Sequence, residues 1–105
     1  SVTSDVISFN AAISACEKGK QWGQALVLLR DMRDEDVMPD VISFNAAISA
    51  GAKGGQWRNA LSLLEEMSTL DLMPDVVSFS AAISACEKIG QWQQAIFLLC
   101  LMRAR

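Results

Sequence analysis

Two columns of polar residues recur along the chain at intervals of 35 residues, and their side chains are suited to hydrogen bonding. One column consists of Asp5, Asp40 and Asp75, and the other of Asn10, Asn45 and Ser80. A carboxylate accepts hydrogen bonds, whereas an amide or a hydroxyl group both donates and accepts them. Asn is a mediocre helix former, yet it occupies the same position twice among alanines. This placement favours contact with a ligand.

The same inventory argues against catalysis and against a metal site. The chain contains no His, so the usual imidazole base is absent. Its three Cys residues show no CxxC spacing, which excludes the common zinc patterns. The Asp residues follow the 35-residue interval instead of converging as the carboxylates of a metal nuclease would. We therefore expect no enzyme activity, no cofactor and no small-molecule substrate.

The cysteines are better explained by packing. Cys16 and Cys86 occupy one repeat position, which Gly51 fills in between, so this position indicates close packing. Cys100 stands where Arg30 and Glu65 stand in the preceding copies, which predicts a surface position.

The 35-residue interval extends to the apolar residues and identifies a tandem array. The Trp and Met columns are Trp22, Trp57 and Trp92, and Met32, Met67 and Met102. With the boundary placed after each Asp, residues 6–40, 41–75 and 76–105 form three repeats of one continuous domain. The third repeat is truncated, and residues 1–5 correspond to the tail of a preceding repeat. We expect a fragment of a longer array.

Each repeat contains two stretches with apolar residues at three- and four-residue steps, which is typical of amphipathic helices. In repeat one these residues are Phe9, Ala12, Ile13 and Cys16, then Trp22, Ala25, Leu26, Leu29 and Met32. A Gly-rich turn separates the two stretches, and Pro39 and Pro74 mark the loops between repeats because Pro cannot continue a helix. The Asp column directly precedes each first stretch, where a carboxylate can cap a helix.

One such repeat cannot bury its apolar face alone, so the repeats must stack. We predict an all-α solenoid of six antiparallel helices wound into a right-handed superhelix, with the Trp, Leu and Met side chains in its core. Because the terminal repeats have no polar cap, we expect the isolated chain to self-associate. No apolar run approaches the roughly 20 residues that span a bilayer, so no membrane partner is expected.

The block VISFNAAISACEKGKQWGQALVLLRDM and its two copies closely resemble the pentatricopeptide repeat. That family also has 35-residue units, an Asn early in the first helix, and a closing Pro-Asp. The alternative is the tetratricopeptide repeat, a 34-residue protein-binding unit. The constant 35-residue interval and the absence of that family's aromatic-Gly pattern in the first helix argue against it.

The resemblance implies binding of single-stranded RNA, with one base read per repeat by two or three side chains. Asn10, Asn45 and Ser80 match the base-reading position, and Asp40 and Asp75 match the closing position that helps to set base choice. Stacking should place Asp40 beside Asn10, and Asp75 beside Asn45. Asn with Asp implies uracil and Ser implies a purine, so the expected target is UU followed by a purine.

The resemblance assigns two further columns, each with an ordinary structural alternative. Ile7, Ile42 and Val77 match the aliphatic position that sandwiches the base, but they could equally pack between repeats. Lys18, Lys53 and Lys88 end the first helix of each repeat, where a cation can contact phosphate or simply interact with the negative end of the helix. Asp40 and Asp75 could likewise serve as helix caps, alone or in addition.

The charge of the chain bears on this interpretation. A net charge of −3 and a pI of about 4.7 have the wrong sign for a nucleic-acid binder. Most acidic residues, however, fall on the second helices and the loops that follow them, although Glu17 and Glu87 adjoin the Lys column. We expect weak RNA binding by this segment alone.

The family acts mainly in mitochondria or chloroplasts, in organellar RNA metabolism, but no targeting segment is visible here.

Overall fold

The computed structural model describes residues 2–88 and 90–104, without the side chains of residues 2–4 and Trp92. Within these ranges the chain forms six α-helices and no strand. The helices are α1 (Val2–Lys18), α2 (Trp22–Asp34), α3 (Val41–Lys53), α4 (Trp57–Thr69), α5 (Val76–Lys88) and α6 (Trp92–Ala104). The predicted all-α repeat fold is therefore confirmed, whereas the core position expected for Trp92 lies outside the described side chains.

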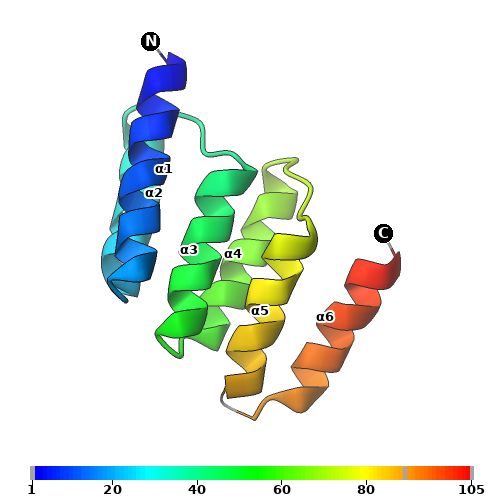
Figure 1. The fold of residues 1–105 in the computed structure, drawn as a ribbon. Helices are drawn as coiled ribbons and strands as arrows, with labels where there is room; N and C mark the ends of the chain where they lie inside the picture. Colours follow the sequence, from blue (N-terminus) through cyan, green and yellow to red (C-terminus); the bar gives the residue numbers. More distant parts are fainter. Residues whose placement is uncertain (1, 89, 105) are drawn as a thin grey trace.

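The helices pack as three stacked hairpins in two layers (Figure 1). The first helices, α1, α3 and α5, lie side by side and form what we call the inner face. The second helices, α2, α4 and α6, form the outer face, and α2 and α4 also contact the first helix of the next repeat. The resulting slab measures 42 × 29 × 17 Å. The handedness of the superhelix stays a prediction.

The core lies between the two layers and uses the residues that the apolar periodicity selects. Ile13 and Phe44 from the first helices are fully buried, as are Met32 and Met67 from the second helices. Phe9, Cys16, Trp22 and Leu26 are partly buried and pack against this core. Since both layers contribute at every level, each repeat completes the core of its neighbour.

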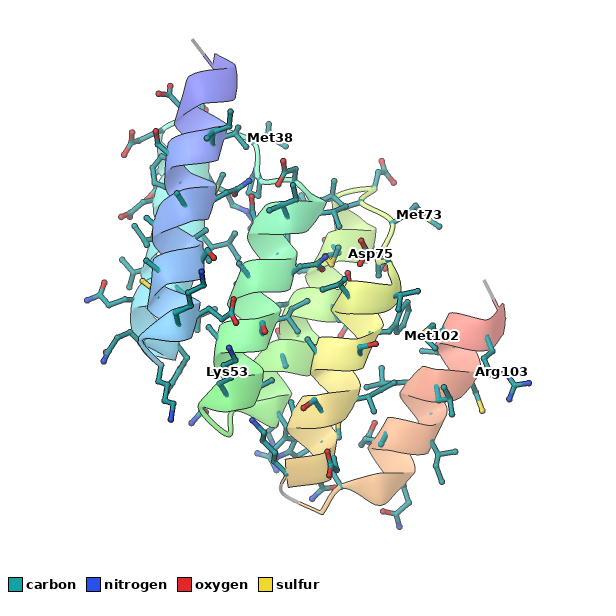
Figure 2. The ribbon with its side chains drawn as sticks, in the orientation of Figure 1. Met38, Lys53, Met73, Asp75, Met102 and Arg103 are labelled. Atoms are coloured by element: carbon teal, nitrogen blue, oxygen red, sulfur yellow. The ribbon has the colours of Figure 1, made fainter. Side chains whose placement is uncertain are left out.

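Four apolar residues depart from the prediction that every Leu and Met lies in the core. Met38 and Met73 are exposed in the loops before α3 and α5, where no helix covers them (Figure 2). Leu99 and Leu101 are exposed on α6, which packs against α5 alone among the described helices.

Within residues 2–88 and 90–104, no helix is long and apolar enough to cross a membrane.

The Asp caps predicted for the first helices are correct at Asp40 and wrong at Asp5. Asp40 is the N-cap of α3, as expected, and follows Pro39. Asp5 is not a cap, because α1 already begins at Val2 and continues through it. The reason is local: Ser4 stands where Pro39 and Pro74 stand, so nothing in the backbone ends the helix before Asp5.

Candidate nucleic-acid interface

The side chains of Asn10, Asp40 and Ser43 meet where α1 adjoins the start of α3. The Asn10 Nδ2 donates to Asp40 Oδ1 at 3.1 Å, and the Ser43 hydroxyl donates to Asn10 Oδ1. The predicted adjacency of Asn10 and Asp40 is thus confirmed. Asp40, the last residue of repeat one, holds one end of the Asn10 amide, and Ser43 of repeat two holds the other.

The same arrangement recurs 35 residues later, between α3 and α5. Asn45 Nδ2 donates to Asp75 Oδ1 at 3.1 Å, and the Ser78 hydroxyl donates to Asn45 Oδ1. Figure 2 shows Asp75 at the start of α5, beside α3. We call each of these two groups an Asn–Asp–Ser set. The two sets place the predicted base-reading residues in register along the inner face.

The Asp of each set also caps its helix. Asp40 Oδ1 accepts from the Ser43 backbone N–H at 3.0 Å, and the Asp40 backbone N–H donates to Ser43 Oγ at 3.1 Å, which completes a capping box. Asp75 and Ser78 make the same two bonds at 3.0 and 3.1 Å. Capping and contact with Asn are therefore simultaneous roles of these carboxylates.

These hydrogen bonds hold the carboxylates in their charged form. Partial burial raises the pKa of Asp40, but hydrogen bonds from Ser43 and Asn10 outweigh it and keep that pKa below its ordinary value. The Ser78 backbone N–H lowers the pKa of Asp75 against a smaller effect of burial, and the Asn45 and Ser78 side chains lower it further. An ionised carboxylate only accepts hydrogen bonds, so it must face the Nδ2 end of each Asn.

Each Asn keeps hydrogen-bonding capacity for a ligand. An amide has two N–H donors and two lone pairs on its oxygen, and the set uses one of each. Asn10 and Asn45 are half-buried, so the remaining N–H and lone pair can be reached from the inner face. A shallow groove of about 290 Å³ runs past them, lined by Asn10, Ser14, Glu17, Ile42, Asn45, Ala46, Ser49 and Val77.

The predicted base-sandwiching residues are exposed. Ile7, Ile42 and Val77 have exposed fractions of 62%, 64% and 57%. None of the three is therefore buried between repeats, and two of them line the groove. Ser80 is also exposed and holds the Asn position on α5. Contact of these residues with a base stays a prediction.

The lysines at the ends of the first helices differ in their contacts. Lys53 Nζ forms a salt bridge of 2.5 Å with Glu17 Oε2, and Figure 2 shows Lys53 at the end of α3 that adjoins α1. Lys88 Nζ donates to the carbonyl oxygen of Ala52 at 3.4 Å, while Lys18 is exposed. Two of the three lysines therefore contact the preceding repeat, and their contact with phosphate stays a prediction.

The comparison with known families agrees with this geometry. A model of the PPR repeat family matches residues 4–53 and 39–88, and a PPR repeat model matches residues 77–105. The chain belongs to the PPR repeat family. No curated protein matches its sequence.

Solved PPR proteins share the fold closely. Two crystal structures of the pentatricopeptide repeat protein PPR10 in complex with an 18-nt psaJ RNA element are similar, one of them a triple Cys-to-Ser variant. Each superposes with a TM-score of 0.87 at 25% identity and covers 95% of this chain. The chain spans 15% of the PPR10 chain.

The serines of the two sets are not among the site residues predicted from the sequence. Ser8, Ser43 and Ser78 follow the 35-residue interval, and each stands three residues after an Asp. That spacing is the signature of a capping box and could have identified them. The contact of Ser43 and Ser78 with the Asn of the preceding repeat has no such signature, because it depends on how two repeats stack.

The cysteines of this PPR segment agree with the packing interpretation. Cys86 and Gly51 are buried at the shared position, and burial raises the pKa of the Cys86 thiol. Cys100 is exposed, as predicted. In the described part of the chain, no group of three or more His, Cys, Asp or Glu residues is placed to hold a metal ion.

Proposed function

We propose that this PPR segment binds single-stranded RNA along its inner face and reads one base per repeat. The observation that carries the proposal is the Asn–Asp–Ser set, which recurs with the same partners between α1 and α3 and between α3 and α5. Each set leaves one donor and one acceptor beside an exposed aliphatic side chain. The similarity to PPR10, which is solved in complex with RNA, supports the same ligand class.

Two uracils followed by a purine are the proposed target. The Watson–Crick edge of uracil offers an N–H flanked by carbonyl oxygens, which matches the free lone pair and N–H of Asn10 or Asn45. Asp40 and Asp75 fix the direction of each Asn amide. The free N–H and lone pair of the amide can therefore match a base edge with one order of donor and acceptor, and not an edge with the opposite order. Ser80 implies a purine through the family resemblance.

The remaining contacts of the proposed complex are apolar and electrostatic. Ile7, Ile42 and Val77 cover the faces of the bases, and the Lys column contacts phosphates. Because Glu17 already pairs with Lys53, the inner face has little free positive charge, and affinity should be modest. The three recognition units are residues 6–40, 41–75 and 76–105. By family resemblance, the chain binds RNA in mitochondria or chloroplasts.

The test is a fluorescence anisotropy titration at low salt with labelled RNAs of equal length. RNA that carries UU followed by a purine should bind more tightly than poly-C. The double variant Asn10→Ser with Asn45→Ser should shift the preference toward purines. The matched control is Asn59→Ser on α4, which changes the same residue type on the outer face and should leave the preference unchanged.

Two results would count against the proposal. If the unmodified chain binds poly-C as tightly as the UU-purine RNA, the proposed assignment of bases to repeats is wrong. Binding of a peptide or helical partner that is indifferent to salt and to the Asn10/Asn45 double change would point instead to a protein-binding solenoid.

We also propose that the isolated chain self-associates through its last helix. Ile96, Phe97, Leu99 and Leu101 are exposed on α6, which is apolar around most of its circumference. An apolar helix of this kind is normally covered. Size-exclusion chromatography with light scattering should show a mass above 11.4 kDa that falls on dilution, whereas a monomer at every concentration would exclude this.

A further inference from the structure

Ser43 and Ser78 are fully buried polar residues whose hydroxyl groups cross the boundary between repeats. Ser43 belongs to repeat two but hydrogen-bonds to Asn10 of repeat one. Ser78 belongs to repeat three but hydrogen-bonds to Asn45 of repeat two. A capping box needs its hydroxyl only as an acceptor for the N-cap N–H. The hydroxyl proton has two acceptors in reach, Asp40 Oδ1 at 3.0 Å and the nearer Asn10 Oδ1, so its contact with Asn10 across the repeat boundary needs an explanation of its own.

The geometry of the amide supplies the explanation. Asp40 holds Asn10 through the Nδ2 end alone, and a single hydrogen bond lets the amide plane rotate about that contact. The Ser43 hydroxyl holds the Oδ1 end, so the plane is fixed at two points. The free N–H and the free lone pair of Asn10 are then presented together in one direction. Two fixed points are what a side chain needs in order to discriminate between base edges.

We propose that Ser43 and Ser78 are positioning residues that set base discrimination by the Asn of the preceding repeat. This inference rests on the proposed RNA-binding function and deepens it. Recognition of one nucleotide then depends on three side chains, Asn10 from one repeat with Asp40 and Ser43 around the next boundary. A substitution at Ser43 alters the reading by Asn10 and leaves Asn45 unaffected, because Asn45 is held by Asp75 and Ser78.

The binding test uses the 105-residue chain and three RNAs, which carry UU-purine, CU-purine and UC-purine. For each variant the measured quantity is the ratio of Kd values between the uracil and the cytosine at one position. Ser43→Ala should reduce discrimination at the first position by roughly 3- to 10-fold, the worth of one hydrogen bond, and leave the second position unchanged. Ser78→Ala should reduce discrimination at the second position alone.

Two variants separate positioning from helix capping. Ser43→Thr retains the hydroxyl and should restore discrimination at the first position. Ser8→Ala removes the hydroxyl of the same repeat position in α1, where Ser8 is exposed and belongs to neither Asn–Asp–Ser set, and should change neither position. A residue that only stabilises the fold would weaken binding of all three RNAs by one factor and leave the ratios intact. That result would overturn the inference.

A measurement without RNA distinguishes failure of this inference from failure of the proposed function. The side-chain NH₂ signals of Asn10 and Asn45 can be followed by NMR relaxation in the free chain. Ser43→Ala should lower the order parameter of the Asn10 amide and leave that of Asn45 unchanged. If RNA binding fails while this selective loss of order is seen, the function is wrong and the positioning contact is real. If the Asn10 amide has the same order parameter in the unmodified chain and in Ser43→Ala, the positioning role is refuted, whatever the result of the RNA titrations.

Discussion

The two junctions between repeats share their Asn–Asp–Ser sets but differ in the other contacts that cross them. On the inner face both contain an Asn–Asp–Ser set with an Asn–Asp distance of 3.1 Å. On the outer face, Arg33 of the first junction pairs with Glu66 and lies over the Phe44 ring, 5.9 Å from its centroid. In the second junction the positions of Arg33 and Glu66 are occupied by Ser68 and Leu101, which line an apolar groove of about 350 Å³.

The difference shows which contacts a stack of repeats can exchange. An exposed ion pair links α2 to α4 in the first junction, and an apolar groove takes its place between α4 and α6 in the second, so we infer that these outer contacts are exchangeable. At the far end of the inner face, Glu17 accepts from Lys53 in the first junction, whereas the Ala52 carbonyl accepts from Lys88 in the second. The Asn–Asp–Ser set is not exchangeable in this way, because each member is a partner of the other two, and losing one leaves two groups unsatisfied.

The largest effect on stability is expected from removing both carboxylates of the sets. Asp40→Ala with Asp75→Ala deletes two helix caps and the acceptors for Asn10 and Asn45. At about 1–2 kcal/mol for each cap, the double variant should lose roughly 2–4 kcal/mol of unfolding free energy, measured by urea denaturation. The two single variants should cost similar amounts if the junctions are equivalent.

Asp5→Ala is the control for this prediction, because Asp5 lies within α1 and caps nothing. Its effect should stay within about 0.5 kcal/mol, as for an ordinary surface position. A double variant no less stable than Asp5→Ala would show that the sets contribute nothing to stacking.

The next largest effect should be confined to the first junction, where Trp22 packs against Gly54. A Cβ added at Gly54 would lie 2.5 Å from Trp22 Cδ1, which is too close without a shift of the indole. Gly54→Ala should therefore cost about 1–3 kcal/mol by overpacking. Thermal unfolding measures the difference.

Gly51, which lies within α3 three residues before Gly54, provides the opposite case. A Cβ there would lie 3.5 Å or more from its neighbours, in ordinary contact, and Ala favours a helix over Gly by about 0.5–1 kcal/mol. Gly51→Ala should thus raise the melting temperature while Gly54→Ala lowers it. If both substitutions change it in the same direction, the contact with Trp22 does not constrain this junction.

A smaller effect should follow from protonating the two carboxylates. Their pKa values are lower in the folded chain than in the unfolded chain, so they stabilise the fold fully above the unfolded value of about 4. That contribution is lost as the pH falls through the folded pKa. Unfolding measured from pH 6 down to pH 2 should show decreasing stability, and Asp40→Asn with Asp75→Asn should flatten the lower part of the curve. An unchanged slope in that variant would assign the acid sensitivity to other carboxylates.

The sequence predicts most of the inner face because its information is local and repeated. The 35-residue interval brings Asn10 beside Asp40 once stacking is assumed, and helix periodicity selects core residues such as Ile13 and Met32. The sequence does not predict contacts that depend on the offset between neighbouring helices. The pairing of Lys53 with Glu17 and that of Ser43 with Asn10 cross a repeat boundary and leave no pattern within one repeat.

The errors have local physical causes as well. The expectation that Asp5 caps a helix assumed that the first copy begins like the others, but Ser4 stands where Pro39 and Pro74 lie in the non-helical loops before α3 and α5. The expectation that all Met and Leu residues are buried ignored their setting. Met38 and Met73 lie in loops, and Leu99 lies on α6, which packs against α5 alone among the described helices.

The smallest effect, and the one that tests whether the outer contacts are exchangeable, concerns Arg33 and Glu66. Both side chains are about one third exposed, so Glu66→Gln should cost at most about 1 kcal/mol and less at high salt. Ser68→Arg with Leu101→Glu would build the same pair into the second junction and should change stability by no more. It also replaces an exposed Leu by a charge and should lower the mass seen by light scattering. A loss of several kcal/mol in either variant would mean that each outer contact is specific to its junction, and that the inner sets alone do not determine how these repeats stack.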